Sequence, residues 1–286
     1  MHIPVLSREV IEYLAVRPEG IYLDATAGLG GHTAQIASQL TTGFVIANDR
    51  DAESLELARR YTAEWAGRIR FHHGRFSRLD EALRASGVDA VDGLLADLGV
   101  SRYQLTQGER GFSLLADGPV DMRMDRTQET SAYQLVNELA EENLADLIYR
   151  YGEERRARKI ARAIVQARPI RSTLELARVI ERAIARTGRL HPATQTFMAL
   201  RIAVNRELEE LDGLLELLPR LVKPGGRVVF LTFMSLEDRK VKFRFRELAK
   251  EGSLRILTKH VVRPTEQEIA YNPAARSAML RAAERI

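Results

Sequence analysis

LDATAGLGGH, at residues 23–32, indicates more about this chain than any other stretch. In it an apolar run ends in Asp24, the chain turns through three glycines, and a helical pattern extends from residue 32 to residue 40. A second apolar run at residues 44–47 leads to Asp49. This order predicts a strand, a glycine turn, a helix and a second strand with an acid at its end.

The glycine turn is typical of sites that bind an adenosine cofactor. Gly28, Gly30 and Gly31 lack a Cβ, so the backbone can take positive φ and a ligand can approach closely. The helix that follows offers unpaired N–H groups. Asp49 lies about 20 residues further on, where a carboxylate can hold ribose hydroxyls. The alternative is a tight turn without a ligand; the acids Asp24 and Asp49 on either side favour the cofactor.

The spacing of the glycines distinguishes between adenosine cofactors. A dinucleotide site usually reads Gly-x-Gly-x-x-Gly, but Thr33 stands where the third spaced glycine would be. An acid at the position of Asp24 also suits a cationic ligand better than a diphosphate. S-adenosylmethionine carries a sulfonium and an ammonium and no phosphate. The turn therefore predicts S-adenosylmethionine.

The composition excludes several classes of protein. The 286 residues are 45% apolar, which is sufficient for one large domain or two modest ones. No apolar run approaches the roughly 20 residues of a membrane span, and the N-terminus has no signal-peptide pattern. The absence of cysteine excludes disulfides, thiolate metal sites and cysteine nucleophiles. The six histidines show no metal-ligand spacing, and the adjacent His72 and His73 are expected in a strand. We expect a cytoplasmic protein without a metal site.

The net charge of +4 is unevenly distributed. Residues 150–189 hold 12 basic and 4 acidic side chains, so the remainder of the chain is net acidic. A basic segment of this kind indicates a polyanionic partner. The alternative is a solvated face of arginine-rich helices.

Strand and helix patterns alternate along the first hundred residues. Helical patterns at 51–61 and 79–85 are each followed by a strand pattern, at 69–74 and 91–98. This alternation predicts a parallel, doubly wound sheet.

The alternation stops after the fourth strand. Residues 101–205 contain no strand pattern, whereas helical patterns cover 131–151 and 153–167. A capping box at residues 172–175 opens a helix that is expected to end at Gly188.

The sheet is predicted to resume near the C-terminus. Residues 226–233 form a buried strand pattern, and the sequence SLED at 235–238 is expected to cap another helix. Residues 254–257 and 277–281 are expected to supply the final edge strands.

These patterns predict an α/β fold: a Rossmann-like, S-adenosylmethionine-dependent methyltransferase sheet with an inserted all-helical domain. The predicted sheet domain comprises residues 1–104 and 206–286, and the insertion comprises residues 105–205. Ligands bind at the carboxyl ends of such strands. We therefore expect the insertion to overhang the reaction site and to recognise the substrate.

Two residues after predicted strands are candidate site residues. Asp97 ends the fourth strand, at the same sheet edge as Gly30 and Asp49, near the reactive end of the cofactor or near its adenine. The alternative is that Asp97 only caps the next turn. Phe76 follows the third strand, where an aromatic ring can stack on adenine or pack in the core.

The loop DGPVDMRMD at residues 117–125 has three carboxylates at four-residue spacing. On a helix they would face one way, as in a metal site. However, Gly118 and Pro119 oppose a helix, and Arg123 lies among the acids. We expect an acid–arginine network that orders the loop over the site.

The lack of cysteine also restricts the methylation chemistry. Methylation of a pyrimidine at ring carbon 5 normally needs a thiolate that attacks carbon 6. An exocyclic amine needs only alignment with the methyl group and an acceptor for its hydrogen. Asp97 is the candidate catalytic residue for that acceptor, and acids of the 117–125 loop offer the same chemistry.

The chain resembles the bacterial 16S rRNA (cytosine-N(4))-methyltransferases, which modify a decoding-centre cytosine. The resemblance extends over nearly the whole chain. The motifs that carry it are DATAGLGGHT at 24–33, DLGVS at 97–101, ERGFS at 109–113, DGPVDMRMD at 117–125, YGEER at 151–155, HPAT at 191–194, ALR at 199–201, SLEDR at 235–239 and NPAARS at 272–277.

The resemblance implies a set of residues that contact S-adenosylmethionine. They are Gly30, Gly31, His32, Asp49, Phe76, Asp97 and Gln104. Two positions depart from the family: Tyr103 replaces a usual proline, and Met234 replaces a usual histidine. Position 234 is therefore left out of the predicted site.

The resemblance implies 16S rRNA, within the small ribosomal subunit, as the partner, and neither DNA nor a membrane. One alternative is a methyltransferase that acts on a protein or a small molecule. Another is a non-catalytic RNA-binding assembly factor that keeps the fold. The fold alone does not distinguish these functions; the basic segment and the shared motifs favour rRNA.

Overall fold

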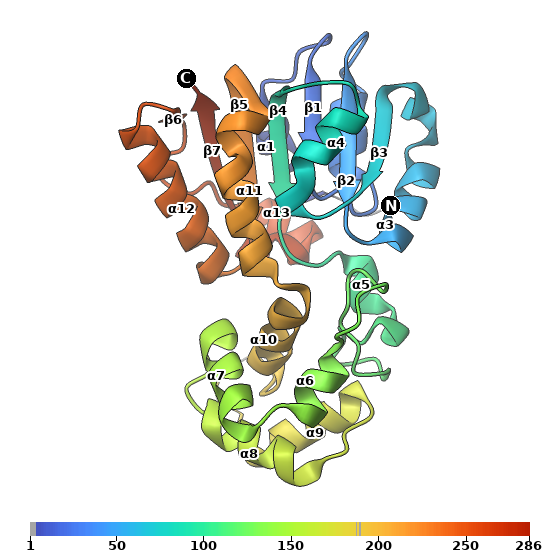
Figure 1. Cartoon of the computed structure of the whole chain (residues 1–286), viewed down its shortest axis with the longest axis vertical. Coiled ribbons are helices and arrows are strands. Elements are labelled where there is room, and N and C mark those ends of the chain that lie inside the picture. The colour runs from blue at the N-terminus through green and yellow to red at the C-terminus, as the bar shows by residue number, and fades with distance from the viewer. Residues whose placement is uncertain (1–3, 187, 189) are drawn as a thin grey trace. The chain divides into compact units, whose positions relative to one another are not determined.

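The structure, a computed structural model, describes residues 4–186, 188 and 190–286 of the chain. They form two compact units, coloured along the chain in Figure 1. The sheet unit comprises Met1–Gly99 and Leu208–Ile286, and the helical unit comprises Val100–Glu207. The sequence predicts these boundaries after residues 104 and 205.

Within the described residues, the sheet unit contains a seven-stranded sheet in the order β3-β2-β1-β4-β5-β7-β6. Neighbours from β3 to β5 pair in parallel, whereas β7 is antiparallel to both β5 and β6. The predicted α/β class is confirmed. The strands are β1 (Ile21–Asp24), β2 (Phe44–Asp49), β3 (Ile69–His73), β4 (Val91–Asp97), β5 (Val222–Thr232), β6 (Leu254–Ile256) and β7 (Met279–Arg285).

Successive strand residues face opposite layers, because side chains alternate along a strand. Leu23 and Val228 belong to one apolar cluster, and their neighbours Tyr22 and Val229 belong to another. Helices α4 (Leu79–Ala85), α11 (Glu207–Leu221) and α12 (Ser235–Lys250) complete the first cluster and lie in front of the sheet in Figure 1. Helices α1 (Ser7–Leu14), α2 (Gly31–Ala37) and α3 (Ala52–Tyr61) complete the second cluster. Both faces are therefore covered, as a largely parallel sheet requires.

The helices of the sheet unit connect these strands. They are α1 (Ser7–Leu14), α2 (Gly31–Ala37), α3 (Ala52–Tyr61), α4 (Leu79–Ala85), α11 (Glu207–Leu221), α12 (Ser235–Lys250) and α13 (Glu266–Tyr271), with 3-10 turns η1 (Ala63–Arg68), η2 (Phe76–Arg78) and η4 (Pro273–Ser277). Asp51 caps α3 through the backbone N–H groups of Glu53 and Ser54.

The prediction of an edge strand at residues 277–281 was wrong. β7 lies inside the sheet, between β5 and β6, and extends to Arg285. Leu280 and Ala282 are fully buried. Strand order depends on pairing between distant segments, which a local pattern does not contain.

The helical unit has its own apolar core. Buried residues from α6 to α10 form one cluster, which Phe112, Val120 and Met122 of the preceding loop join. In the described part of this unit no extended strand occurs, only an isolated bridge between Pro119 and Ser172. The helices are α5 (Arg102–Thr106), α6 (Ala132–Glu138), α7 (Glu141–Gly152), α8 (Ala157–Ala167), α9 (Thr173–Ala183) and α10 (Thr194–Asn205), with the 3-10 turn η3 (Gly108–Arg110).

Two helix predictions in this unit needed correction. The pattern at 131–151 belongs to two helices, because Leu139 and Ala140 are extended between them. The helix that Ser172 caps ends at Ala183 and not at Gly188, because the β-branched Ile184 is extended and buried. Among the described helices, none is both long and apolar enough to cross a membrane.

Candidate cofactor site

Three aspartates end neighbouring parallel strands, and therefore lie at one edge of the sheet. Asp24 on β1 is level with Ala47 of β2 and Leu95 of β4. Asp49 and Asp97 stand two residues beyond those partners. The glycine turn after Asp24 consequently passes between the other two carboxylates.

The turn is anchored on both sides by hydrogen bonds. The N–H of Gly28 donates to Asp49 Oδ2 over 2.8 Å. On the other side, the N–H of Asp97 donates to Thr26 Oγ1 over 2.6 Å. The backbone of residues 25–30 is thus fixed between β2 and β4.

Asp24 serves the turn itself. It has no exposed surface, and its oxygens accept from Thr33 Oγ1 at 2.6 Å and from the N–H of Thr26 at 3.1 Å. Burial raises the pKa of Asp24 to about 6. The interpretation of Asp24 as a partner for a cationic ligand is corrected, because the side chain is enclosed by the turn.

The physical reason for a glycine differs between two positions of the turn. Gly30 has φ +85°, and a Cβ there would lie 2.6 Å from Thr62 Cγ2, so this glycine is needed for packing as well as for the turn. Gly28 also has positive φ, but a Cβ there would meet only the carbonyl oxygen of Thr26, at 3.9 Å. Space for a ligand therefore lies beside Gly28. Gly31, the first residue of α2, packs against Pro4.

Asp49 is held by backbone donors on both oxygens. Its Oδ2 accepts from Gly28, and its Oδ1 accepts from the N–H of Asp51 at 2.9 Å. Each carboxylate oxygen can accept a second hydrogen bond, so two hydroxyls of a ribose fit this residue. Burial raises the pKa of Asp49 to about 6, and the charges of Asp51 and Asp24 add to that shift.

Asp97 has an unsatisfied oxygen. Its Oδ1 is buried and has no hydrogen-bond partner among the described residues. Its Oδ2 lies 3.7 Å from Nε2 of His32, a buried residue in the first turn of α2. Burial raises the pKa of Asp97 to about 8, with contributions from the charges of Asp24 and Glu237. A buried carboxylate oxygen without a donor is costly, so it indicates a ligand that supplies one. The ammonium of S-adenosylmethionine and the amine of a cytosine both fit.

Glu237 and Asn48 are site residues that the sequence reasoning missed. Glu237 is buried in the first turn of α12, and its Oε2 accepts from the N–H of Phe233 at 3.0 Å. This side chain therefore helps to hold the start of the helix predicted at the SLED motif. Asn48 donates to the carbonyls of Ala25 and Gly74 and thereby joins the glycine turn to the end of β3. A buried polar residue within an apolar strand is the signal that marks Asn48.

Phe76 and Gln104 have local roles in the structure. Phe76, in η2, packs against the first apolar cluster of the sheet unit, which agrees with the core alternative. Gln104 lies in the helical unit, where its side chain accepts from the N–H of Ser101 at 2.9 Å in a capping box of α5. Their cofactor contacts stay predictions.

The acid–arginine contacts predicted in the 117–125 loop are present, and the position of this loop over the site stays a prediction. The guanidinium of Arg123 donates to both oxygens of Asp121, at 2.7 and 2.9 Å. It also donates to the carbonyls of Arg126 and Gln128, so it joins the loop to the chain that follows. No group of three or more acids or histidines in the described part of the chain is arranged to hold a metal ion.

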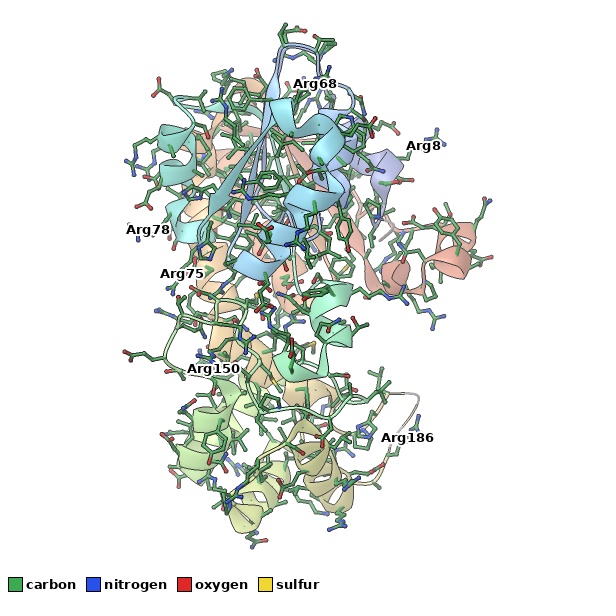
Figure 2. The ribbon with its side chains drawn as sticks, turned by 90° about the vertical axis from the view of Figure 1, so that its right-hand side faces the viewer. Arg8, Arg68, Arg75, Arg78, Arg150 and Arg186 are labelled. Carbon is green, nitrogen blue, oxygen red and sulfur yellow. The ribbon has the colours of Figure 1, made fainter. Side chains whose placement is uncertain are left out.

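The basic side chains of the helical unit lie on more than one side of it. Figure 2 shows Arg150 and Arg186 on opposite sides of this unit. Arg156 is tied to the buried Glu154, with Nε 3.0 Å from Oε1. Across α8 and the turn before it, Arg155, Arg158 and Lys159 are exposed and have no ion pair within the described residues.

Comparisons with known proteins agree with this geometry. The family model described as the MraW methylase family matches residues 1–286. A protein of Solibacter usitatus named ribosomal RNA small subunit methyltransferase H is 63% identical over 284 residues, 99% of each chain. A protein of the same name from Cyanothece sp. is 48% identical over 287 residues, 100% of this chain and 95% of the relative. The solved structure of PH0851 matches with a TM-score of 0.50 at 13% identity, over 97% of this chain and 45% of that chain, and supports the fold alone. Because the family model matches the chain from end to end, this chain belongs to the MraW methylase family.

Proposed function

We propose that this chain transfers a methyl group from S-adenosylmethionine to the 4-amino nitrogen of a cytosine in the decoding centre of 16S rRNA. It is a methyltransferase by family, and its relatives are named as methyltransferases of small-subunit ribosomal RNA. The observation that carries the proposal is the buried Oδ1 of Asp97, which has no hydrogen-bond partner in the described part of the chain and lies at the sheet edge that the glycine turn follows. We assign the reaction to the cytoplasm and the substrate to the small ribosomal subunit.

The donor side of the site is formed by the turn and by Asp49. S-adenosylmethionine, when bound, supplies a methyl group activated by its sulfonium. Asp49 accepts hydrogen bonds from the ribose, and the backbone beside Gly28 gives the ligand room. We include Gly30, Gly31, His32, Phe76 and Gln104 among the contacting residues.

The acceptor side depends on Asp97. As the 4-amino nitrogen bonds to the methyl carbon, the methyl–sulfur bond breaks and the nitrogen loses one proton. The charged form of Asp97 accepts that proton. A raised pKa, about 8, makes Asp97 a stronger base than an ordinary carboxylate. The amine attacks directly, so a chain without cysteine can perform this reaction.

The helical unit supplies the surface for RNA in this proposal. Arg155, Arg158 and Lys159 are exposed and free of ion pairs among the described residues, so they can neutralise phosphates. Arg156 is not part of this surface, because the buried Glu154 occupies its guanidinium.

Mass spectrometry of 16S rRNA tests the proposal. RNA from a strain that lacks this protein should have lost the 4-methyl group of the decoding-centre cytosine, and the wild-type gene should restore it. The variant Asp97→Asn should restore the methyl group at less than about 1% of the wild-type rate, because the acceptor of the proton is lost. An intact mark in the deletion strain contradicts the substrate; full activity of Asp97→Asn contradicts the role of Asp97.

A further inference from the structure

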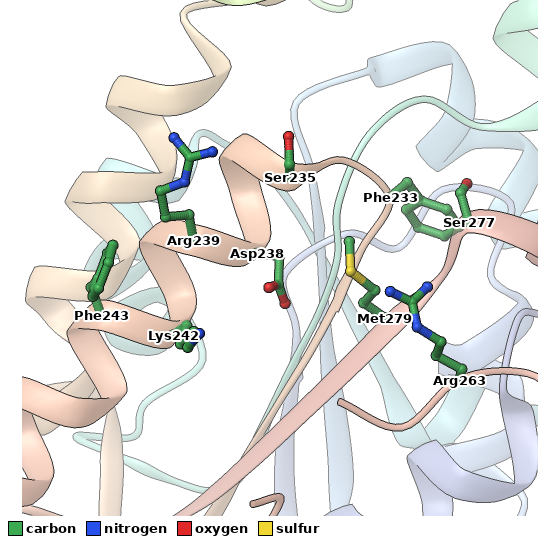
Figure 3. Close-up of a pocket in the computed structure, with 9 residues that line it drawn as sticks. All are labelled: Phe233, Ser235, Asp238, Arg239, Lys242, Phe243, Arg263, Ser277 and Met279. Carbon is green, nitrogen blue, oxygen red and sulfur yellow. The ribbon is translucent and has the colours of Figure 1, made fainter. Parts of the chain in front are cut away.

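A cavity in the sheet unit has no role in the site described above. It has a volume of about 560 Å³ and lies at the carboxyl end of β5, between α12 and the start of β7. Figure 3 shows α12 side chains on one side of it and Arg263 with Met279 on the other. Its lining residues are Phe233, Ser235, Asp238, Arg239, Lys242, Phe243, Arg263, Ser277 and Met279.

The register of the sheet places this cavity near the proposed proton acceptor. Asp97 on β4 is level with Leu231 on β5, and Leu231 is level with Leu280 on β7. Phe233 and Met279, which line the cavity, follow and precede those residues at the same edge. Two strand spacings separate β4 from β7, about 10 Å. The cavity is therefore within reach of a nucleotide that neighbours a base held at Asp97.

The charges around the cavity suit an anion. Arg239, Lys242 and Arg263 line it. The one acid in the lining, Asp238, is neutralised by Arg281, whose Nε and Nη2 donate to its two oxygens over 2.7 and 2.9 Å. Lys242 and Arg263 have no hydrogen bond or ion pair with any residue that the structure describes. Two cations without a protein partner at a cavity indicate a phosphate.

The aromatic lining suits a base. Phe243 lies one turn after Arg239 on α12, and 52% of its surface is exposed. An exposed phenylalanine beside unpaired cations is typical of surfaces where a base stacks and the backbone phosphate is neutralised. A phosphate alone would not account for the ring.

We propose that this cavity holds a nucleotide of the RNA substrate adjacent to the methylated cytosine. Lys242 and Arg263 bind its phosphate, and Phe243 stacks on its base. The inference rests on the proposed function, because it takes the ligand from the RNA substrate.

The first experiment measures binding and methyl transfer separately. Binding of a fluorescent single-stranded RNA with the decoding-centre sequence is followed by anisotropy, and methyl transfer is followed on small subunits from a deletion strain. Lys242→Ala/Arg263→Ala should weaken RNA binding about tenfold, with a salt slope less steep by about 0.7 because the two cations bind one phosphate, and raise KM while kcat changes little. The matched control is Arg246→Ala/Lys250→Ala, two exposed cations on the same helix outside the cavity. Calorimetric S-adenosylmethionine affinity should be unchanged in both.

The second variant tests the base. Phe243→Ala should weaken RNA binding about tenfold, and Phe243→Tyr should retain it, because an aromatic ring is all that stacking needs. Equal RNA binding by the cavity and control variants overturns the inference. If Lys242→Ala/Arg263→Ala weakens RNA binding and Phe243→Ala does not, the cavity does not hold a nucleotide. Only the binding of a backbone phosphate then remains.

The failure of the proposed function has a different signature. In that case the wild-type protein does not methylate the small subunit, whereas the anisotropy titration still reports whether the cavity variants bind RNA more weakly than the control. Wild-type protein that binds no RNA overturns the inference as well.

Discussion

At the scale of single residues, three aspartates at one sheet edge differ through their hydrogen-bond partners. Asp24 is enclosed by the turn, Asp49 accepts from two backbone N–H groups, and Asp97 has an oxygen without a partner in the described chain. Burial raises the pKa of all three. In the proposed reaction the same residue type thus stabilises the turn at Asp24, binds ligand hydroxyls at Asp49 and accepts a proton at Asp97, according to its surroundings.

The buried Asp24 should make stability depend on pH. Its pKa rises from an ordinary value of 3.8 to about 6 on folding, so ionisation of this carboxyl costs more in the folded chain. Its contribution to stability falls as pH rises from about 4 to about 6. Asparagine does not titrate. The free energy of unfolding of Asp24→Asn, relative to that of the wild type, should therefore rise by about 2 kcal/mol between about pH 4.5 and pH 7. Urea unfolding measures this difference between the two proteins. A difference that does not change with pH would contradict the prediction.

Asp49 should control cofactor affinity. Asp49→Ala removes the acceptor of the ribose hydroxyls and of the Gly28 N–H, so S-adenosylmethionine should bind tenfold to a hundredfold more weakly, the equivalent of about 1.5–3 kcal/mol. The pKa of Asp49 is about 6, so wild-type affinity should also fall as the carboxylate is protonated below that pH. Isothermal calorimetry checks both effects. Asp51→Asn is the control, because it keeps an acceptor at the cap of α3; unchanged affinity in Asp49→Ala would refute the ribose role.

At the scale of elements, local patterns predicted most of the fold. The four strands up to residue 97 follow from apolar runs that end in turns, and the start of α9 follows from the cap at Ser172. The position of β7 did not, because strand order depends on distant pairing. The break between helices at Leu139 does not follow from the local pattern either, because the apolar pattern continues through it. The roles of Asp24 and Glu237 could not be predicted from the sequence, because only the packing around a carboxyl reveals whether it faces a ligand or caps a turn.

The turn between α7 and α8 contains two adjacent arginines, of which one is paired with a buried carboxylate and the other is exposed. Arg156→Ala should lower the free energy of unfolding by about 1–2 kcal/mol, because it leaves the buried Glu154 without its guanidinium partner. Arg155→Ala, one residue away and exposed, should change stability by less than about 0.5 kcal/mol. Urea unfolding compares the two variants. Equal losses would show that the Arg156 pair contributes nothing beyond an exposed charge.

At the scale of the whole molecule, the basic segment and the three aspartates at the sheet edge lie in different units. The acids that end the parallel strands and the glycine turn belong to the sheet unit, and the basic segment belongs to the helical unit. A chain organised in this way can lose RNA affinity without losing cofactor affinity. The two properties should therefore respond to different substitutions.

The salt dependence of RNA binding should reveal this division. Arg155→Ala/Arg158→Ala/Lys159→Ala removes three exposed charges of the helical unit, so the negative slope of log K against log salt should become less steep by about 2, at roughly 0.7 per single-strand phosphate. Arg8→Ala/Arg246→Ala/Lys250→Ala removes three exposed charges from the sheet unit and should leave the slope unchanged. S-adenosylmethionine should bind both variants with wild-type affinity. Equal slopes for the two triple variants would mean that only net charge attracts the RNA, and the helical unit would then have no distinct part in recognition.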